Sequence, residues 1–108
     1  MSTQRLFRIY LGSEIEASRR QYGLEIVDTV KATEIVAKHF PKGFTVLQGL
    51  GHYLPADRPL VRESTTLFEI LGDYTDAPKV RTLAEELKRE FRQDSVILTV
   101  SDVFFDFI

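Results

Sequence analysis

Two short stretches of the chain combine residue types that could hold or activate a ligand. The first contains Gly49, Gly51, His52 and Tyr53, which lie inside one expected strand and not at a strand-to-helix turn. A glycine within a strand allows a bulge or the close approach of a ligand, and histidine can serve as an acid or a base near neutral pH. This stretch is therefore either a ligand-binding segment or a structural bulge that bends its hairpin.

The second stretch contains Arg62 and Glu63, with Glu69 farther along the same expected strand. On a strand Glu63 and Glu69 point to one face, and Arg62 points to the other. If the carboxylates lie on the sheet face opposite the helices, they need partners, because an isolated buried charge is too costly. They form either a polar site in a cleft between subunits or salt bridges at an interface.

Composition excludes several other kinds of site. The chain has no cysteine, which rules out disulfides, thiolate nucleophiles and cysteine-ligated metals. Its 14 basic and 16 acidic residues leave a net charge of -2, and this charge balance does not predict nucleic-acid binding. His39 and His52 lack metal-ligand spacing, and we expect neither a metal nor a cofactor. His39 instead lies at the end of an expected helix, where the helix dipole stabilises a positively charged side chain.

Length and hydropathy bear on organisation and location. The 108 residues predict one domain, 1–108, in which 103–108 form an apolar C-terminal extension. No stretch approaches the roughly 20 apolar residues of a membrane span, and the first residues do not read as a signal peptide. We therefore expect a cytoplasmic protein that does not bind membranes.

Hydrophobic periodicity predicts the elements that must position these residues. A strand over 5–11 places Phe7, Ile9 and Leu11 on one face. Strands are also expected over 44–54, 60–71 and 95–100, and the last five residues of the third have the pattern of a central strand covered on both faces. Residues 12–28 are either a short helix, begun by a capping box at Ser13–Glu16, or an irregular excursion.

Two helices are expected between these strands. Asp28 is a good N-cap for a helix over about 29–40, whose apolar face we predict from a set of four residues. That set is Val30, Thr33, Ala37 and Phe40. Asp76 and Pro78 are expected to start the second helix, which carries a clearer stripe. The stripe is Val80, Leu83, Ala84, Leu87 and Phe91.

The resulting β-α-β-β-α-β order predicts an α+β fold. With right-handed crossovers and a short central hairpin, the order gives a ferredoxin-like βαββαβ sandwich. Its four-stranded antiparallel sheet has the order 4-1-3-2, and both helices cover one face. The other face then needs a partner or an unusually polar surface.

Three segments resemble a bacterial family of small domains of unknown function. These are Phe40–Leu47, which reads F-P-K-G-F-T-V-L, then Arg62-Glu63-Ser64, and Phe91–Val96, which reads F-R-Q-D-S-V. Gly51 and Tyr53 lie between them, and Tyr53 stands where members often have tryptophan. The resemblance covers about residues 39–100 and implies no established activity. More distantly, the layout looks like that of trimeric CutA-like and PII-like proteins, a likeness of fold that says nothing of ligands.

The C-terminal residues carry the firmest expectation about assembly. Val103, Phe104, Phe105, Phe107 and Ile108 follow the last strand, which is an edge strand in the predicted order. A bare apolar edge is a template for aggregation. This tail either folds back over its own sheet or packs on a neighbouring subunit. We favour the neighbour, in a closed homo-oligomer that is a trimer or a dimer.

Three function classes follow from this reasoning. The leading hypothesis is a non-enzymatic, oligomeric regulatory domain that binds a small-molecule ligand or a protein partner. Its candidate binding residues are Gly49, Gly51, His52, Tyr53, Arg62 and Glu63. The rival is a small enzyme of the dimeric α/β-barrel type, with His52 or Glu63 as acid or base. The third is a purely architectural subunit. An enzyme or a binding domain needs a pocket, and an architectural subunit does not.

Overall fold

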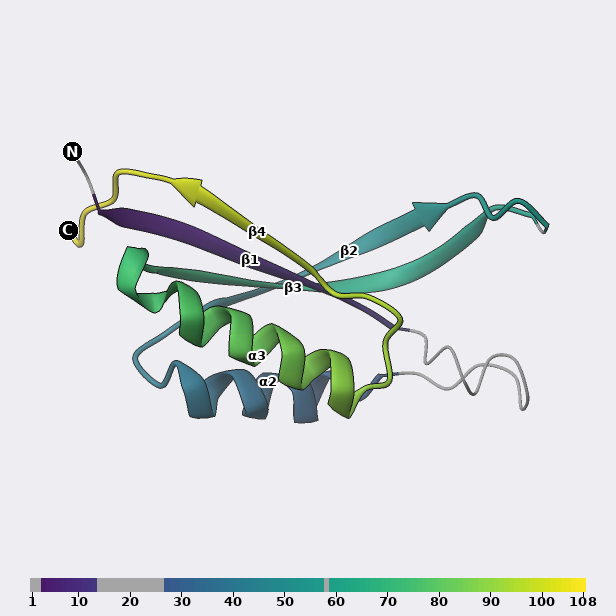
Figure 1. The fold of residues 1–108 in the computed structure, drawn as a ribbon, viewed down its shortest axis with the longest axis horizontal. Helices are drawn as coiled ribbons and strands as arrows, with labels where there is room; N and C mark the ends of the chain where they lie inside the picture. The colour runs from purple at the N-terminus through teal and green to yellow at the C-terminus, as the bar shows by residue number, and fades with distance from the viewer. Residues whose placement is uncertain (1–2, 14–26, 58) are drawn as a thin grey trace.

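A computed structural model describes residues 3–13, 27–57 and 59–108 of the chain. Its elements follow the predicted order, with one short 3-10 turn added before the second helix (Figure 1). They are β1 Gln4–Gly12, α2 Thr29–His39, β2 Thr45–Tyr53, β3 Val61–Asp73, η1 Tyr74–Asp76, α3 Ala77–Glu90 and β4 Ile97–Asp102. None of the helices in this part of the chain is long and apolar enough to cross a membrane.

The four strands form one antiparallel sheet in the order β2-β3-β1-β4, and α2 and α3 lie together against one of its faces (Figure 1). This topology confirms the predicted α+β, ferredoxin-like layout. The central β3 pairs with β1 over nine residues and with β2 over nine residues, but the two partners are offset. As a result β2 and the first part of β3 run past the end of β1 as a projecting hairpin.

The core lies between the sheet and the two helices. Phe7, Ile9 and Leu11 alternate into it from β1 and are almost completely buried, as their spacing predicts. The predicted α3 stripe is confirmed as well: Val80, Leu83 and Leu87 are fully buried, and Ala84 and Phe91 are nearly so. These residues belong to one hydrophobic cluster, which fixes α3 on the sheet.

The prediction for the apolar face of α2 was wrong except at Phe40, which is partly buried and packs against the core. The buried residues are Ala32, Ile35 and Val36, whereas Val30 is 67% exposed. Positions 32, 35 and 36 also follow helical spacing, and this stripe buries the branched apolar side chains of Ile35 and Val36. Asp28 is the N-cap as predicted, and its side chain accepts hydrogen bonds from the backbone N–H groups of residues 30 and 31.

His39, expected near the C-terminal end of this helix, makes a specific contact that its position alone did not indicate. Its Nε2 lies 3.0 Å from Oε1 of Glu86 on α3, so the pair joins the two helices. Lys31 and Glu90 form a second link, with 2.6 Å between Nζ and Oε1. The helices are therefore connected through polar side chains at two points along their length.

Several element boundaries differ from the prediction by one or two residues. β4 begins at Ile97 instead of Ser95 and ends at Asp102, and β3 extends to Asp73. The expected cover on both faces of β3 is absent within the described chain, where Leu71 is 49% exposed on the face away from the helices. The capping box expected at 13–16 lies outside the described residues beyond Ser13, whose carbonyl accepts a hydrogen bond from the N–H of Val27.

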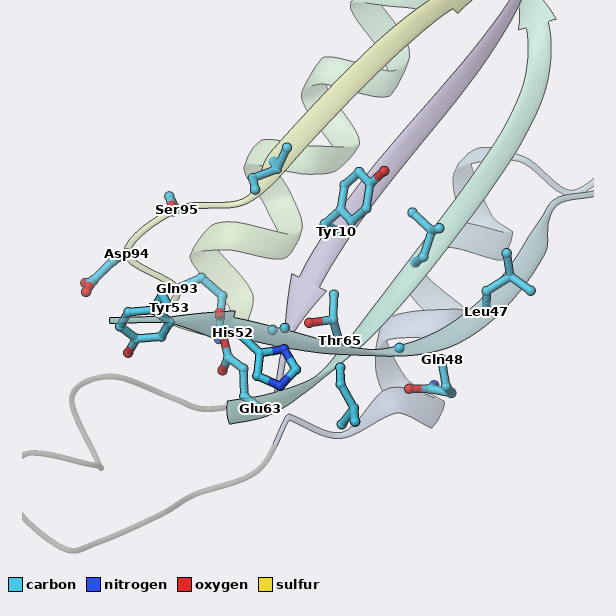
Figure 2. Close-up of a pocket in the computed structure, with 16 residues that line it drawn as sticks. Tyr10, Leu47, Gln48, His52, Tyr53, Glu63, Thr65, Gln93, Asp94 and Ser95 are labelled. Atoms are coloured by element: carbon cyan, nitrogen blue, oxygen red, sulfur yellow. The ribbon is translucent and has the colours of Figure 1, made fainter. Parts of the chain in front are cut away.

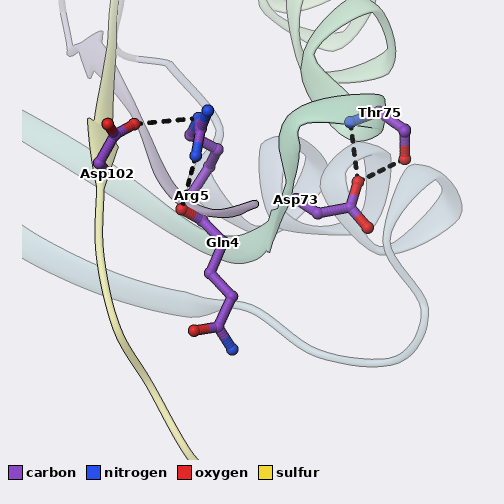
Figure 3. Close-up of polar contacts among 5 residues, drawn as sticks. All are labelled: Gln4, Arg5, Asp73, Thr75 and Asp102. Atoms are coloured by element: carbon purple, nitrogen blue, oxygen red, sulfur yellow. Dashed lines mark hydrogen bonds and ion pairs between the residues drawn. The ribbon is translucent and has the colours of Figure 1, made fainter. Parts of the chain in front are cut away.

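α3 starts at Asp76 and Pro78 as predicted, with the proline in its first turn. Asp76 occupies the N-cap position but makes no capping hydrogen bond there. Asp73 instead caps the preceding 3-10 turn, accepting a hydrogen bond of 2.7 Å from the N–H of Thr75 and another from its hydroxyl (Figure 3). Asp76 completes a reciprocal capping box by accepting from the N–H of Asp73 at 2.9 Å.

This cap predicts a pH dependence of stability. The hydroxyl and the N–H of Thr75 lower the pKa of Asp73 below its ordinary value. Because the fold favours the charged form, the cap stabilises fully above the unfolded-state pKa of about 3.9 and less as the pH falls through the lowered folded-state pKa. Asp73→Asn keeps an oxygen acceptor but does not titrate, so its stability difference from the native chain should shrink on acidification.

Unfolding curves between pH 5 and pH 2 test this expectation, with NMR titration of the Asp73 carboxyl as the direct measurement. Thr75→Val is the companion variant, because it removes the hydroxyl donor and should raise the pKa of Asp73 toward its ordinary value. An Asp73 carboxyl that titrates at the ordinary value in the native chain contradicts the prediction.

Candidate functional site

The sheet face away from the helices, here called the open face, carries a hollow at the projecting-hairpin end (Figure 2). The hollow encloses about 1030 Å³. Residues from β1, β2 and β3 form its floor, and the turn before β4 closes one side with Gln93, Asp94 and Ser95. Segments that are far apart in the sequence thus meet at one place.

Three glycines shape the floor of the hollow. A Cβ added to Gly51 would lie 2.7 Å from Oγ1 of Thr65, and one added to Gly12 would lie 2.8 Å from Oε1 of Glu63. Both distances are shorter than real Cβ contacts, so the side chains of Thr65 and Glu63 occupy the space that these glycines leave. Gly49 differs, because a Cβ there would meet nothing within 4 Å. It faces the empty part of the hollow.

A row of apolar side chains crosses all four strands beside the glycines. Leu47 of β2 pairs with Leu67 of β3, which pairs with Tyr10 of β1, which in turn pairs with Ile97 of β4. All four line the hollow. The row offers a flat apolar surface of the kind on which a planar ring can lie.

The next row on the open face is polar and internally paired. Arg8 of β1 donates from Nε to Oε2 of Glu69 on β3 at 2.7 Å. This contact raises the pKa of Arg8 above its ordinary value. We expected Glu69 to pair across a subunit interface or to belong to a cleft site; its partner lies instead in the same chain. The ion pair marks the boundary of the apolar row.

The charged side chains of the lining are acidic. Glu63, which is half-buried, and the exposed Asp94 line the hollow. The described lining includes no lysine and no arginine. The floor therefore favours a ligand that presents a positive charge or hydrogen-bond donors. Within residues 3–13, 27–57 and 59–108, no group of three or more acidic or histidine side chains could hold a metal ion.

The structure brings five of the six predicted binding residues to this hollow. Gly49, Gly51, His52, Tyr53 and Glu63 line it, and Arg62 does not. Gly51 is directly opposite Glu63, and His52 is directly opposite Arg62. Since side chains alternate along a strand, His52 and Arg62 project from the face of the hairpin opposite to Glu63. The hairpin thus separates the two candidate acid or base groups.

Sequence reasoning missed most of the remaining lining. Tyr10 and Gly12 share the open face of β1 by simple alternation, a signal that was available in the sequence. Thr65 was recognised only as part of a strand. Gln93, Asp94 and Ser95 could not be placed, because the turn after α3 reaches the hollow only through the packing of α3 on the sheet.

The C-terminal tail, residues 103–108, lies beside the start of β1. The Gln4 side chain holds it through two hydrogen bonds: Nε2 donates to the carbonyl of Phe105 at 3.0 Å, and Oε1 accepts from its N–H at 3.2 Å. The rings of Phe105 and Phe107 pack edge to face, with centroids 5.5 Å apart. Phe104 and Phe107 are each 86% exposed, so the tail leaves these two aromatic side chains unburied, whereas Phe105 is half-buried.

Comparison with known proteins gives a fold and a family. The structure is similar to that of a phage SAM lyase in complex with S-methyl-5'-thioadenosine, with a TM-score of 0.70, 19% identity, and coverage of 94% of this chain and 83% of that one. A phage SAM lyase in the apo state gives a TM-score of 0.67 and 20% identity, with coverage of 94% of this chain and 82% of that one. These likenesses show the fold.

Among curated proteins, no relative matches the chain. The family profile described as "Protein of unknown function (DUF3574)" matches residues 8–107, which is nearly the whole chain. The resemblance to an uncharacterised family of small domains is thereby confirmed, and the chain belongs to the DUF3574 family.

Proposed function

We propose that the protein is a small-molecule-binding domain whose ligand occupies the hollow of the open face. The observation that carries this proposal is the glycine-lined floor, where Gly12 and Gly51 make room for Glu63 and Thr65 while Gly49 leaves open space. An architectural subunit has no need of such a floor. The adjoining apolar row supplies the flat surface that a binding site of this size requires.

The lining indicates the chemistry of the ligand. An apolar row beside a carboxylate fits a molecule with a planar ring and a positively charged or donating group. Nucleosides that carry a thioether or a sulfonium group meet this description. The phage SAM lyase, which has the same fold, was solved with S-methyl-5'-thioadenosine. That complex supports testing this class first.

We further propose that the domain acts as a regulatory homo-oligomer, a trimer or a dimer, without turning its ligand over. The exposed aromatic residues of the tail support self-association. The second candidate is a small enzyme in which Glu63 acts as the acid or base, and the likeness to a lyase favours it. His52 also lines the hollow, but strand alternation directs it to the opposite face of the hairpin from Glu63, so Glu63 is the better placed of the two groups.

The decisive experiment fills the hollow without disturbing the chain. Gly49→Val adds a β-branched side chain where a Cβ meets nothing, so the variant should be as stable as the native protein or more so. S-methyl-5'-thioadenosine and S-adenosylmethionine, at tenfold excess over Kd, should raise the Tm of the native protein by at least about 5 °C. They should not raise the Tm of Gly49→Val.

Matched controls separate occupation of the hollow from general effects. Ser64→Val places the same side chain on the opposite face of the hairpin and should keep the full Tm shift. Glu63→Gln should reduce the shift for the sulfonium compound more than for the neutral thioether, and Glu34→Gln on the exposed side of α2 should reduce neither. An unchanged shift in Gly49→Val contradicts the proposed site, and consumption of the ligand in a chromatographic assay favours the enzyme.

A further inference from the structure

The projecting hairpin carries an exposed apolar surface. Among the described strands β2 pairs only with β3, so none of them covers its outer edge, and eight of its nine residues are exposed. Near the hairpin tip Leu50 is 71% exposed and Leu54 is 73% exposed. We call residues 50–54 and 60–64 the hairpin arm. An apolar surface of this kind on a small protein marks an interaction site.

The tail is a second exposed apolar segment in the same chain. Phe104 and Phe107 project into solvent, while Gln4 holds the backbone of Phe105 against the chain. The aromatic side chains are therefore presented outward from an anchored segment. Asp106 stands among them and is exposed as well.

The tail and the arm of one chain cannot meet. The tail is fixed at Gln4, at one end of β1, and the arm begins beyond Gly12, at the other end (Figure 1). The eight residue steps between these positions, at about 3.3 Å each, separate them by roughly 26 Å. Residues 106–108 extend the tail by at most about 11 Å. Contact between the two segments therefore requires two copies.

The charges of the two segments are complementary. Arg62 and His52 face each other across the arm, on the face that also carries Leu50. Arg62 is exposed, and neither it nor Asp106 makes an ion pair with another described residue. This face of the arm thus offers Leu50 beside a cation, and the tail offers aromatic side chains around a carboxylate.

We propose that the tail of one copy docks on the hairpin arm of a second copy, with Asp106 against the partner subunit's Arg62. This inference rests on the proposed self-association and is independent of the ligand. The contact joins unlike surfaces, so it closes either as a reciprocal dimer or as a ring. It covers the face of the hairpin that carries Arg62, which is opposite to the face that carries Glu63.

Charge reversal tests the contact. Arg62→Glu and Asp106→Arg should each raise the dissociation constant of the native oligomer at least about tenfold, because each places like charges together. The double variant restores a pair of opposite charges, with the negative charge at position 62 and the positive charge at position 106. Its dissociation constant should return close to the native value. Glu34→Arg, a reversal on the exposed side of α2, should leave the dissociation constant unchanged. Sedimentation velocity over a dilution series gives these constants.

Cross-linking locates the contact, since the native chain has no cysteine. Leu50→Cys mixed with Phe107→Cys should form a disulfide between copies under mild oxidation, whereas Thr82→Cys on α3 mixed with Phe107→Cys should not. A native chain of one-subunit mass, single reversals that associate normally, or a double variant as weak as the single ones overturns the proposal. Ligand binding is measured separately with Gly49→Val, so either proposal can fail while the other stands.

Discussion

Replacing Leu83 or Leu87 by alanine is expected to lower the free energy of unfolding by about 2–5 kcal/mol at either position. Both side chains are fully buried in the middle of α3. They belong to the cluster that also contains Phe7, Ile9 and Phe68 from the sheet. Truncation removes the transfer free energy of the lost methyl and methylene groups and leaves a cavity that the surrounding residues fill only in part.

Denaturant unfolding curves of the two variants measure this loss. Thr82→Ala is the matched control, because Thr82 lies next to Leu83 on the same helix but is exposed, outside the buried stripe. It should change the free energy of unfolding by less than about 0.5 kcal/mol. Losses of that small size at both Leu83 and Leu87 would show that α3 packs on the sheet through another face.

The fold was predictable where a single periodic pattern dominates its element. Phe7, Ile9 and Leu11 are separated by polar or amphipathic residues in β1, so alternation leaves one choice of buried face. In α3 the charged residues between the stripe positions have the same effect. In α2 two overlapping stripes satisfy the helical period, and Val30 competes with Ile35 and Val36. Only the packing against α3 and the sheet decides between them.

The site was predictable only where the type of a single residue and its position within a strand indicate it. Gly49, Gly51 and Glu63 were identified because glycines and a carboxylate within expected strands are unusual. Their relation was not predictable, because it depends on the register that sets Gly51 opposite Glu63 and His52 opposite Arg62. A shift of β2 by one residue in that register would exchange the faces of Gly51 and His52 relative to Glu63 and Arg62. The same register places His52 and Glu63, the two candidate acid or base groups, on opposite faces of the hairpin.

Removing residues 103–108 is expected to convert the oligomer that we propose into a folded monomer or an aggregate. The deletion takes away Phe104 and Phe107, whose side chains are mostly exposed in one chain, and the two hydrogen bonds between Gln4 and Phe105. None of the deleted residues belongs to the central hydrophobic cluster. The domain should therefore keep its fold, while the exposed hairpin arm loses the segment that we propose to cover it.

Light scattering at about 100 μM, which detects association tighter than that concentration, gives the outcome as a mass relative to the 12.4 kDa of one chain. A variant with serine at positions 104, 107 and 108 separates apolar character from chain length, since it keeps Phe105 and its contacts with Gln4. It should dissociate as the deletion does. A native chain that stays monomeric at this concentration, or a serine variant that retains the native oligomeric mass, shows that the aromatic side chains do not hold the assembly together.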